Sequence, residues 1–163
     1  MRTKISYIKE IIFNKKPKIR EVKYEWAQPL EHDFKPRMIV YHHTVVINVT
    51  PHEIDKTHKK RGWAGIGYHF YIRKNGRIYR GRPENVRGAH AVGVNNRAFG
   101  IALEGNFNEE EVTKKQERSL IALSKYLMKK YNITDLKRHK DVSNTECPGK
   151  NFPFEVIKEK LRV

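Results

Sequence analysis

Two residues near the carboxyl end of the chain are of types that bind metal ions together. His139 and Cys147 lie eight positions apart, and Pro148 and Gly149 follow the cysteine directly. Neutral imidazole and thiolate are ligands that suit zinc. Cys147 is the only cysteine of the chain, so a third ligand has to come from elsewhere. Three protein ligands would leave a fourth position open, as in catalytic zinc sites, whereas a lone cysteine is otherwise typical of a small buried hydrophobic residue.

The third ligand is expected from the adjacent pair His42 and His43. This pair follows the run Met38–Tyr41, whose apolar and aromatic residues predict a buried strand. Successive side chains of a strand point to opposite faces, so the two histidines cannot both reach one metal ion. Spacing alone does not decide between them. A single histidine, taken alone, is more typical of a hydrogen-bonded core or surface residue.

Strands and helices are mixed along the rest of the chain. Thr50–Glu53 has the pattern of a capping box with proline at the first helical position, which predicts a helix ending near Gly62. Asn75-Gly76 separates two strand-like runs, 68–73 and 77–80, and predicts a β-hairpin. Further along, we expect a strand over 99–104, a short strand near Leu136, and a closing helix from about Pro153 to Leu161. A second capping box at Thr113–Gln116 predicts the start of a long helix, whose apolar stripe is formed by Leu120, Leu123, Leu127 and Tyr131.

These elements indicate one α/β domain, in which helices flank a mixed central β-sheet and the histidine-bearing ends meet at one edge. A length of 163 residues fits a single domain. We expect residues 1–35 to form an N-terminal extension packed on a catalytic domain over 36–163. Within the extension, Ile8, Ile11 and Ile12 are spaced as one face of a short helix.

The charge balance indicates an anionic partner. Against 18 acidic residues the chain has 34 lysines and arginines, a net charge of +16. Such a chain is attracted to nucleic acid, anionic lipid or the teichoic acids of a bacterial wall, unless the charge only solvates the surface. No nucleic-acid-binding motif accompanies the charge, so we expect no nucleic acid partner. No apolar run is long enough for a membrane span, and residues 1–13 make a poor signal peptide.

Five sequence blocks, in order, resemble the N-acetylmuramoyl-L-alanine amidase family, which includes bacteriophage amidases and the peptidoglycan recognition proteins. The resemblance runs from about Pro36 to Phe154. The blocks are Tyr41-His42-His43-Thr44, the segment 62–70 (GWAGIGYHF), Gly88-Ala89-His90, Gly100-Ile101-Ala102, and the segment 139–149 (HKDVSNTECPG).

The resemblance implies a Zn²⁺ site formed by His42, His139 and Cys147. Tyr68 matches the catalytic tyrosine of the family, whose hydroxyl is placed to hydrogen-bond the zinc-bound water or the developing oxyanion. The alternative for Tyr68 is a core role, because in a regular strand it would share a face with Phe70 and Ile72.

Thr145 stands where phage-type members often have lysine, and it resembles the recognition proteins in this respect. The Thr145 hydroxyl is a second candidate catalytic group, although it is a weaker hydrogen-bond donor than an ammonium group. The alternative interpretation is that Thr145 is an ordinary loop residue.

We expect three residues to bind substrate: His90, Arg97 and His43. His90 would lie in the cleft or serve a structural role. Arg97 would pair with a carboxylate of the peptide stem or stay solvated, and His43 would be a neighbour of the site on the other strand face. His58 and His69 are expected to orient neighbouring groups or to complete the packing.

The resemblance implies hydrolysis of the amide bond between N-acetylmuramic acid and L-alanine of peptidoglycan. The alternative is a peptidoglycan-binding module without catalysis, and the presence of Cys147 favours the enzyme. We expect a monomeric phage or prophage endolysin, or a bacterial cell-wall hydrolase, that is cytoplasmic until it is released to the wall.

Overall fold

A mixed six-stranded sheet forms the centre of residues 15–163, the part of the chain that the computed structural model describes. The strand order is β1-β4-β3-β5-β2-β6, and neighbouring strands are parallel except for the antiparallel pair β3–β4. The strands are β1 (Ile19–Arg20), β2 (Met38–His43), β3 (Phe70–Ile72), β4 (Ile78–Arg80), β5 (Ala98–Leu103) and β6 (Asp135–Arg138); the helices are α2 (Pro51–Lys60), α3 (Lys114–Tyr131), α4 (His139–Val142) and α5 (Phe154–Leu161). The predicted α/β class and mixed sheet are confirmed.

The central strands β2 and β5 pair over six residues, from Met38 opposite Ala98 to His43 opposite Leu103. All of β5 and all but the first residue of β2 are buried. Both strands are covered on both faces, which explains their nearly continuous apolar sequence. The predicted strands in these two regions are therefore confirmed.

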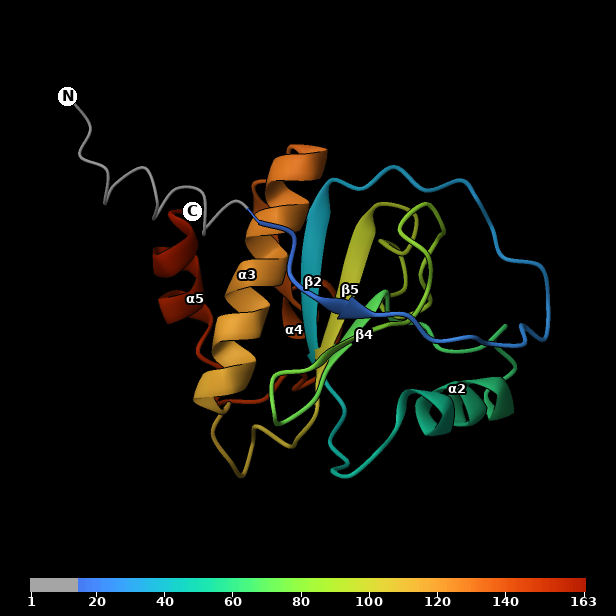
Figure 1. The fold of residues 1–163 in the computed structure, drawn as a ribbon, viewed down its shortest axis with the longest axis horizontal. Helices are drawn as coiled ribbons and strands as arrows, with labels where there is room; N and C mark the ends of the chain where they lie inside the picture. The colour runs from blue at the N-terminus through green and yellow to red at the C-terminus, as the bar shows by residue number, and fades with distance from the viewer. Residues whose placement is uncertain (1–14) are drawn as a thin grey trace.

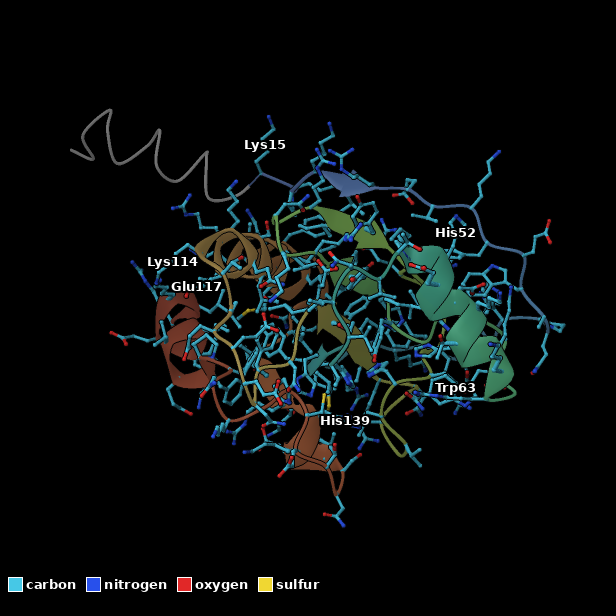
Figure 2. The ribbon with its side chains drawn as sticks, turned by 90° about the horizontal axis from the view of Figure 1, so that it is seen from below. Lys15, His52, Trp63, Lys114, Glu117 and His139 are labelled. Carbon is cyan, nitrogen blue, oxygen red and sulfur yellow. The ribbon has the colours of Figure 1, made fainter. Side chains whose placement is uncertain are left out.

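Helices α3 and α5 cover one face of the sheet, and α2 lies on the other side (Figure 1). Helix α3 begins with the predicted capping box. Thr113 Oγ1 accepts from the backbone N–H of Gln116, and the side-chain oxygen of Gln116 accepts from the backbone N–H of Thr113. Its predicted stripe packs into the larger core, with Leu120, Leu123 and Leu127 fully buried. At the start of α3, Glu117, which is labelled in Figure 2, also forms an ion pair with Lys160 of α5.

Helix α2 carries the smaller core on the opposite face of the sheet. Its capping box at Thr50 is present as predicted, and the helix ends at Lys60, before Gly62 at φ +86°. Ile54 packs there with Tyr71 of β3 and Ala102 of β5. Since His42 and Ala102 are register partners on the parallel strands, the face covered by α2 is also the face on which His42 lies.

The predicted hairpin is formed by β3 and β4, and both strands are shorter than predicted. Gly76 closes the turn by donating its N–H to Arg73 O at 2.8 Å, and it has φ +81°, which suits glycine. Strand β3 begins only at Phe70, because the chain bends at His69. The alternative that places Tyr68 on one face with Phe70 and Ile72 is wrong: Tyr68 packs with the smaller core and the other two with the larger.

The described part of the N-terminal segment lies along the sheet. Ile19 and Arg20 of β1 pair with Ile78 and Tyr79 of β4. Further on, Phe34 stacks on His69 with ring centroids 4.9 Å apart. The division at residue 35 stays a prediction, and the helix suggested by Ile8, Ile11 and Ile12 lies outside the described residues. Within residues 15–163 no helix combines the length and apolar character needed to cross a membrane.

Candidate metal centre and active site

The carboxyl ends of the parallel neighbours β2 and β6 bring three candidate metal ligands together. His42 lies near the end of β2, His139 follows β6 as the first residue of α4 (Figure 2), and Cys147 lies on the segment after α4. One ligand atom of each residue lies within 4.8 Å of the other two. The rings of His42 and His139 have centroids 4.5 Å apart, and Cys147 Sγ is 3.8 Å from His42 Nδ1. The predicted convergence of the histidine-bearing ends is confirmed.

His42 and His43 point to opposite faces, as the alternation of a strand predicts. The ring of His42 faces the cluster and is 2% exposed. The ring of His43 turns away, and its Nδ1 accepts from the backbone N–H of Phe107 at 3.2 Å. His43 contacts the cluster through its backbone instead, where its N–H lies 3.4 Å from Cys147 Sγ. The structure does not bring the His43 side chain to the cluster.

A short helix and a connecting hydrogen bond position the other two ligands. His139 is the first residue of the one-turn helix α4. Asp141 stabilises its start, since its carboxylate accepts from the backbone and the guanidinium of Arg138 at 2.8 to 3.0 Å. Lys140 N–H then donates to Cys147 O at 2.9 Å and joins the two ligand-bearing parts of the segment.

Thr145 and Gly149 shape the turn that carries Cys147. Thr145 Oγ1 accepts from the backbone N–H of Cys147 at 3.2 Å, so the observed contact of this hydroxyl is with the ligand segment. Gly149 has φ +99°, and a Cβ there would lie 2.4 Å from the backbone carbon of Phe107. Only glycine permits this approach. The catalytic role predicted for Thr145 stays a prediction.

His90 lies against His42 and is 7% exposed. Its Nδ1 is 2.9 Å from His42 Nε2, with the two rings perpendicular, and its Nε2 is 2.9 Å from the carbonyl oxygen of Ala98. Burial lowers the pKa of His90 to about 4, so the ring is neutral at pH 7. The sequence suggested a residue of the substrate cleft or a structural one; no local pattern indicated the contact with His42.

Helix α2 holds the segment that precedes Tyr68. Asp55 Oδ1 accepts from Ile66 N–H at 2.8 Å, and His58 Nδ1 accepts from Gly67 N–H at 2.9 Å. The expectation that His58 orients a neighbouring group is thereby confirmed. As a result, the ring centroid of Tyr68 lies 5.1 Å from that of His42 and 5.3 Å from that of His58.

The environment of Tyr68 keeps its hydroxyl protonated. Burial raises the pKa of Tyr68 above its usual value, and the nearby Cys147 raises it further. A protonated phenol beside the three candidate ligands can donate a hydrogen bond to a bound group. The structure thus brings Tyr68 to the cluster, while its catalytic role stays a prediction.

Arg97 lies away from the cluster. It directly precedes Ala98, the first residue of β5, which pairs with Met38 at the start of β2. His42 pairs with Ala102, four residues further along the same strand. Arg97 is exposed at the other end of this strand pair, so the structure does not bring it to the predicted ligands.

The donor set of the cluster fits a zinc ion. Burial lowers the pKa of both His42 and His139, which leaves neutral imidazoles able to bind a metal. In the absence of a metal charge, burial raises the pKa of Cys147 to about 11. The hydrogen bond from the His43 N–H acts in the opposite direction and lowers this pKa. Zinc–sulfur and zinc–nitrogen bonds of about 2.3 and 2.0 Å place tetrahedral ligand atoms roughly 3.5 Å apart, close to the observed 3.8 Å between Cys147 Sγ and His42 Nδ1.

The fold and this site are those of an amide hydrolase. The family model for N-acetylmuramoyl-L-alanine amidases matches residues 32–150, and the chain belongs to this family.

Solved structures and curated relatives agree with this assignment. An endolysin N-acetylmuramoyl-L-alanine amidase, LysCS from Clostridium intestinale URNW, is 72% identical, with a TM-score of 0.91 over 92% of this chain and 99% of that one. The endolysin of Enterobacteria phage T3 is 37% identical over 107 residues, which cover 63% of this chain and 71% of the phage protein. A mutant of Drosophila PGRP-LB, solved in complex with tracheal cytotoxin, is 32% identical, with a TM-score of 0.71 over 81% of this chain and 86% of that one.

Proposed function

We propose that this amidase is a zinc-dependent endolysin that hydrolyses the amide bond between N-acetylmuramic acid and L-alanine in peptidoglycan. The observation that carries the proposal is the cluster of His42, His139 and Cys147, which has the ligand types and number of a catalytic zinc site. The substrate class is supported by the amidase family and by the endolysin relatives. The relative solved in complex with tracheal cytotoxin supports a ligand related to peptidoglycan.

The residues around the cluster have different roles in the proposed reaction. Zinc, when bound, polarises a carbonyl group and activates water for attack on it. Tyr68 donates its hydroxyl proton in a hydrogen bond to the carbonyl oxygen as negative charge develops there. Thr145 accepts from Cys147 N–H and retains its own hydroxyl proton for a second donation. His42 is held by His90, which keeps the ligand ring from turning.

Metal analysis combined with wall digestion tests this function. Purified peptidoglycan incubated with the protein should release new N-terminal alanine, identified by mass spectrometry of the products. A chelator should abolish the release, and added zinc should restore it. Activity that survives complete metal removal would contradict the zinc-dependent mechanism. Tight wall binding without release of alanine would instead favour the non-catalytic binding module.

We further propose that the protein acts as a monomer and stays in the cytoplasm until it is released to the wall. This setting follows from the proposed endolysin role. Light scattering after size-exclusion chromatography tests the monomer, and fractionation of producing cells before lysis tests the location.

Anionic wall polymers are the proposed second partner, and they would bind a basic groove at the β1–β4 edge of the sheet. This groove has a volume of about 350 Å³ and lies between β1, the β3–β4 hairpin and α3. Among the described residues that line it, none is acidic and four are basic: Lys18, Arg20, Arg77 and Arg118. The phosphates of teichoic acids carry the negative charge that such a groove would attract.

A further inference from the structure

We propose that His90 is a positioning residue that holds His42 in the tautomer and orientation required to bind zinc, and that Gly88 and Gly100 form the slot that holds His90. The proposal rests on the zinc site of the proposed function. It assigns to His90 a role toward the metal ligand, in place of a contact with substrate.

The hydrogen bonds of His90 allow one arrangement of protons. The carbonyl oxygen of Ala98 can only accept, so His90 Nε2 carries a proton and donates it at 2.9 Å. The Nδ1 of the neutral His90 ring is then an acceptor, and His42 Nε2 must donate to it at 2.9 Å. The remaining nitrogen, His42 Nδ1, has a free lone pair and lies 3.8 Å from Cys147 Sγ. A backbone carbonyl thereby determines, through His90, which nitrogen of His42 is available to a metal ion.

Two glycines leave the space that the His90 ring occupies. A Cβ on Gly100 would lie 2.6 Å from His90 Cγ and Cδ2, and a Cβ on Gly88 would lie 2.5 Å from Cδ2. Both distances are shorter than atoms in proteins tolerate, so any side chain at either position displaces the ring. Asn95 fixes the backbone of the same residue, because its Oδ1 accepts from the N–H groups of His90 and Ala91 at 2.8 and 2.9 Å.

Loss of this support should weaken zinc binding without removing a ligand. Without an acceptor at His90 Nδ1, the buried N–H of His42 has no partner. The His42 ring can then move its proton to Nδ1, which removes the lone pair that faces Cys147. Loss of such a hydrogen-bonded support typically lowers metal affinity by about 10- to 100-fold.

Zinc affinity of the metal-free protein, measured by competition with a chromophoric chelator, tests the proposal. His90→Phe and Gly100→Ala should each bind zinc about 10- to 100-fold more weakly than the wild type. His90→Asn should retain more affinity than His90→Phe, because its amide oxygen can replace the acceptor Nδ1. The matched controls are Tyr71→Phe, which alters a buried side chain of β3 that bonds to Val49 O, and Gly76→Ala, which strains the hairpin at φ +81°. Both controls should bind zinc as the wild type does.

The protonation of the two rings can be measured in the wild type itself. Long-range ¹H–¹⁵N correlation spectra of the metal-free protein should show His42 and His90 protonated on Nε2. A proton on Nδ1 of either ring would overturn the proposal, as would wild-type affinity in His90→Phe or an equal loss of affinity in the two controls. A wild type that binds no zinc would refute the proposed function itself, and the role of His90 with it.

Discussion

The backbone N–H of His43 lies 3.4 Å from the sulfur of Cys147, and Nδ1 of the preceding residue, His42, lies 3.8 Å from the same sulfur. One strand end therefore supplies both a candidate ligand and a hydrogen-bond donor to a second ligand. An N–H group directed at sulfur favours the thiolate, the form that binds metal. This arrangement depends on two adjacent residues that share a strand and differ in the face of their side chains.

Replacing Cys147 by serine should remove metal binding while preserving the turn. The hydroxyl can still accept from His43, but it does not ionise at neutral pH as a metal-bound thiol does. We expect the zinc content to fall far below one ion per chain and wall hydrolysis to fall by more than about 100-fold, the upper end of losses from a removed metal support. Metal analysis and alanine release measure the two effects. A serine variant with full activity would show that the sulfur is not a ligand.

Tyr68→Phe should reduce turnover without changing the metal content. Removing one donor to an oxyanion typically lowers kcat by about 10²- to 10³-fold, with a smaller effect on KM. The matched control is Tyr71→Phe, which also removes a tyrosine hydroxyl on the same side of the sheet, one that donates to Val49 O at 2.7 Å. The control should lose about 1 kcal/mol of stability and keep its kcat. Equal kcat values in the two variants would assign Tyr68 to packing.

Local sequence patterns predicted most of the fold. The capping boxes at Thr50 and Thr113 act between residues three positions apart, so the starts of α2 and α3 were predictable to the residue. The strand face of Tyr68 was predicted wrongly because the alternation rule was extended past the first residue of β3. The chain bends at His69 and turns Tyr68 toward His42.

Contacts between distant segments were not predictable in the same way. His90 and His42 are 48 residues apart, and the contact depends on a slot between two glycine-containing segments that come together only in the folded sheet. Likewise, Arg97 was expected to pair with a carboxylate of the peptide stem, yet the parallel register of β2 and β5 places it at the opposite strand end. The family resemblance supplied the ligand set, while the spacing of the residues left His42 and His43 as alternatives.

The stability of the metal-free protein should decrease as the pH falls below about 6.5, in part because of His69. Burial lowers the pKa of His69 to about 3, and its two nitrogens are bonded to Val86 O and Gly100 N–H. Between about pH 6.5 and 3 the unfolded chain binds a proton that the folded ring does not. This group therefore stabilises the fold above pH 6.5, and about 1.4 kcal/mol of that stability is lost for each unit as the pH falls through this range.

The variant His69→Phe isolates this contribution. It should cost about 1–3 kcal/mol at pH 7.5, because Gly100 N–H loses its acceptor and Val86 O its donor. It should also show a flatter dependence on pH, so the difference from the wild type becomes smaller at pH 5. Urea unfolding at the two pH values, with chelator present throughout, measures both effects. A constant difference between the two proteins would mean that His69 is not buried in its neutral form.

Binding to anionic walls should depend on the basic groove and on ionic strength. The double variant Arg77→Gln and Arg118→Gln removes two of its four cations, from the hairpin and from α3. We expect wall binding to weaken by about threefold or more at low salt and the difference to vanish near 0.5 M salt, where surface charges are screened. The matched control, Lys60→Gln with Arg162→Gln, makes the same change of net charge at exposed positions that do not line the groove.

Co-sedimentation with purified walls, before and after chemical removal of teichoic acid, separates the two partners of the protein. If the groove binds the phosphates of the polymer, the double variant and the wild type should bind stripped walls equally, and both should cleave soluble muropeptides at the same rate. An equal loss in the control variant would show that net charge alone determines wall affinity. A loss that persists on stripped walls would place the groove in contact with peptidoglycan instead.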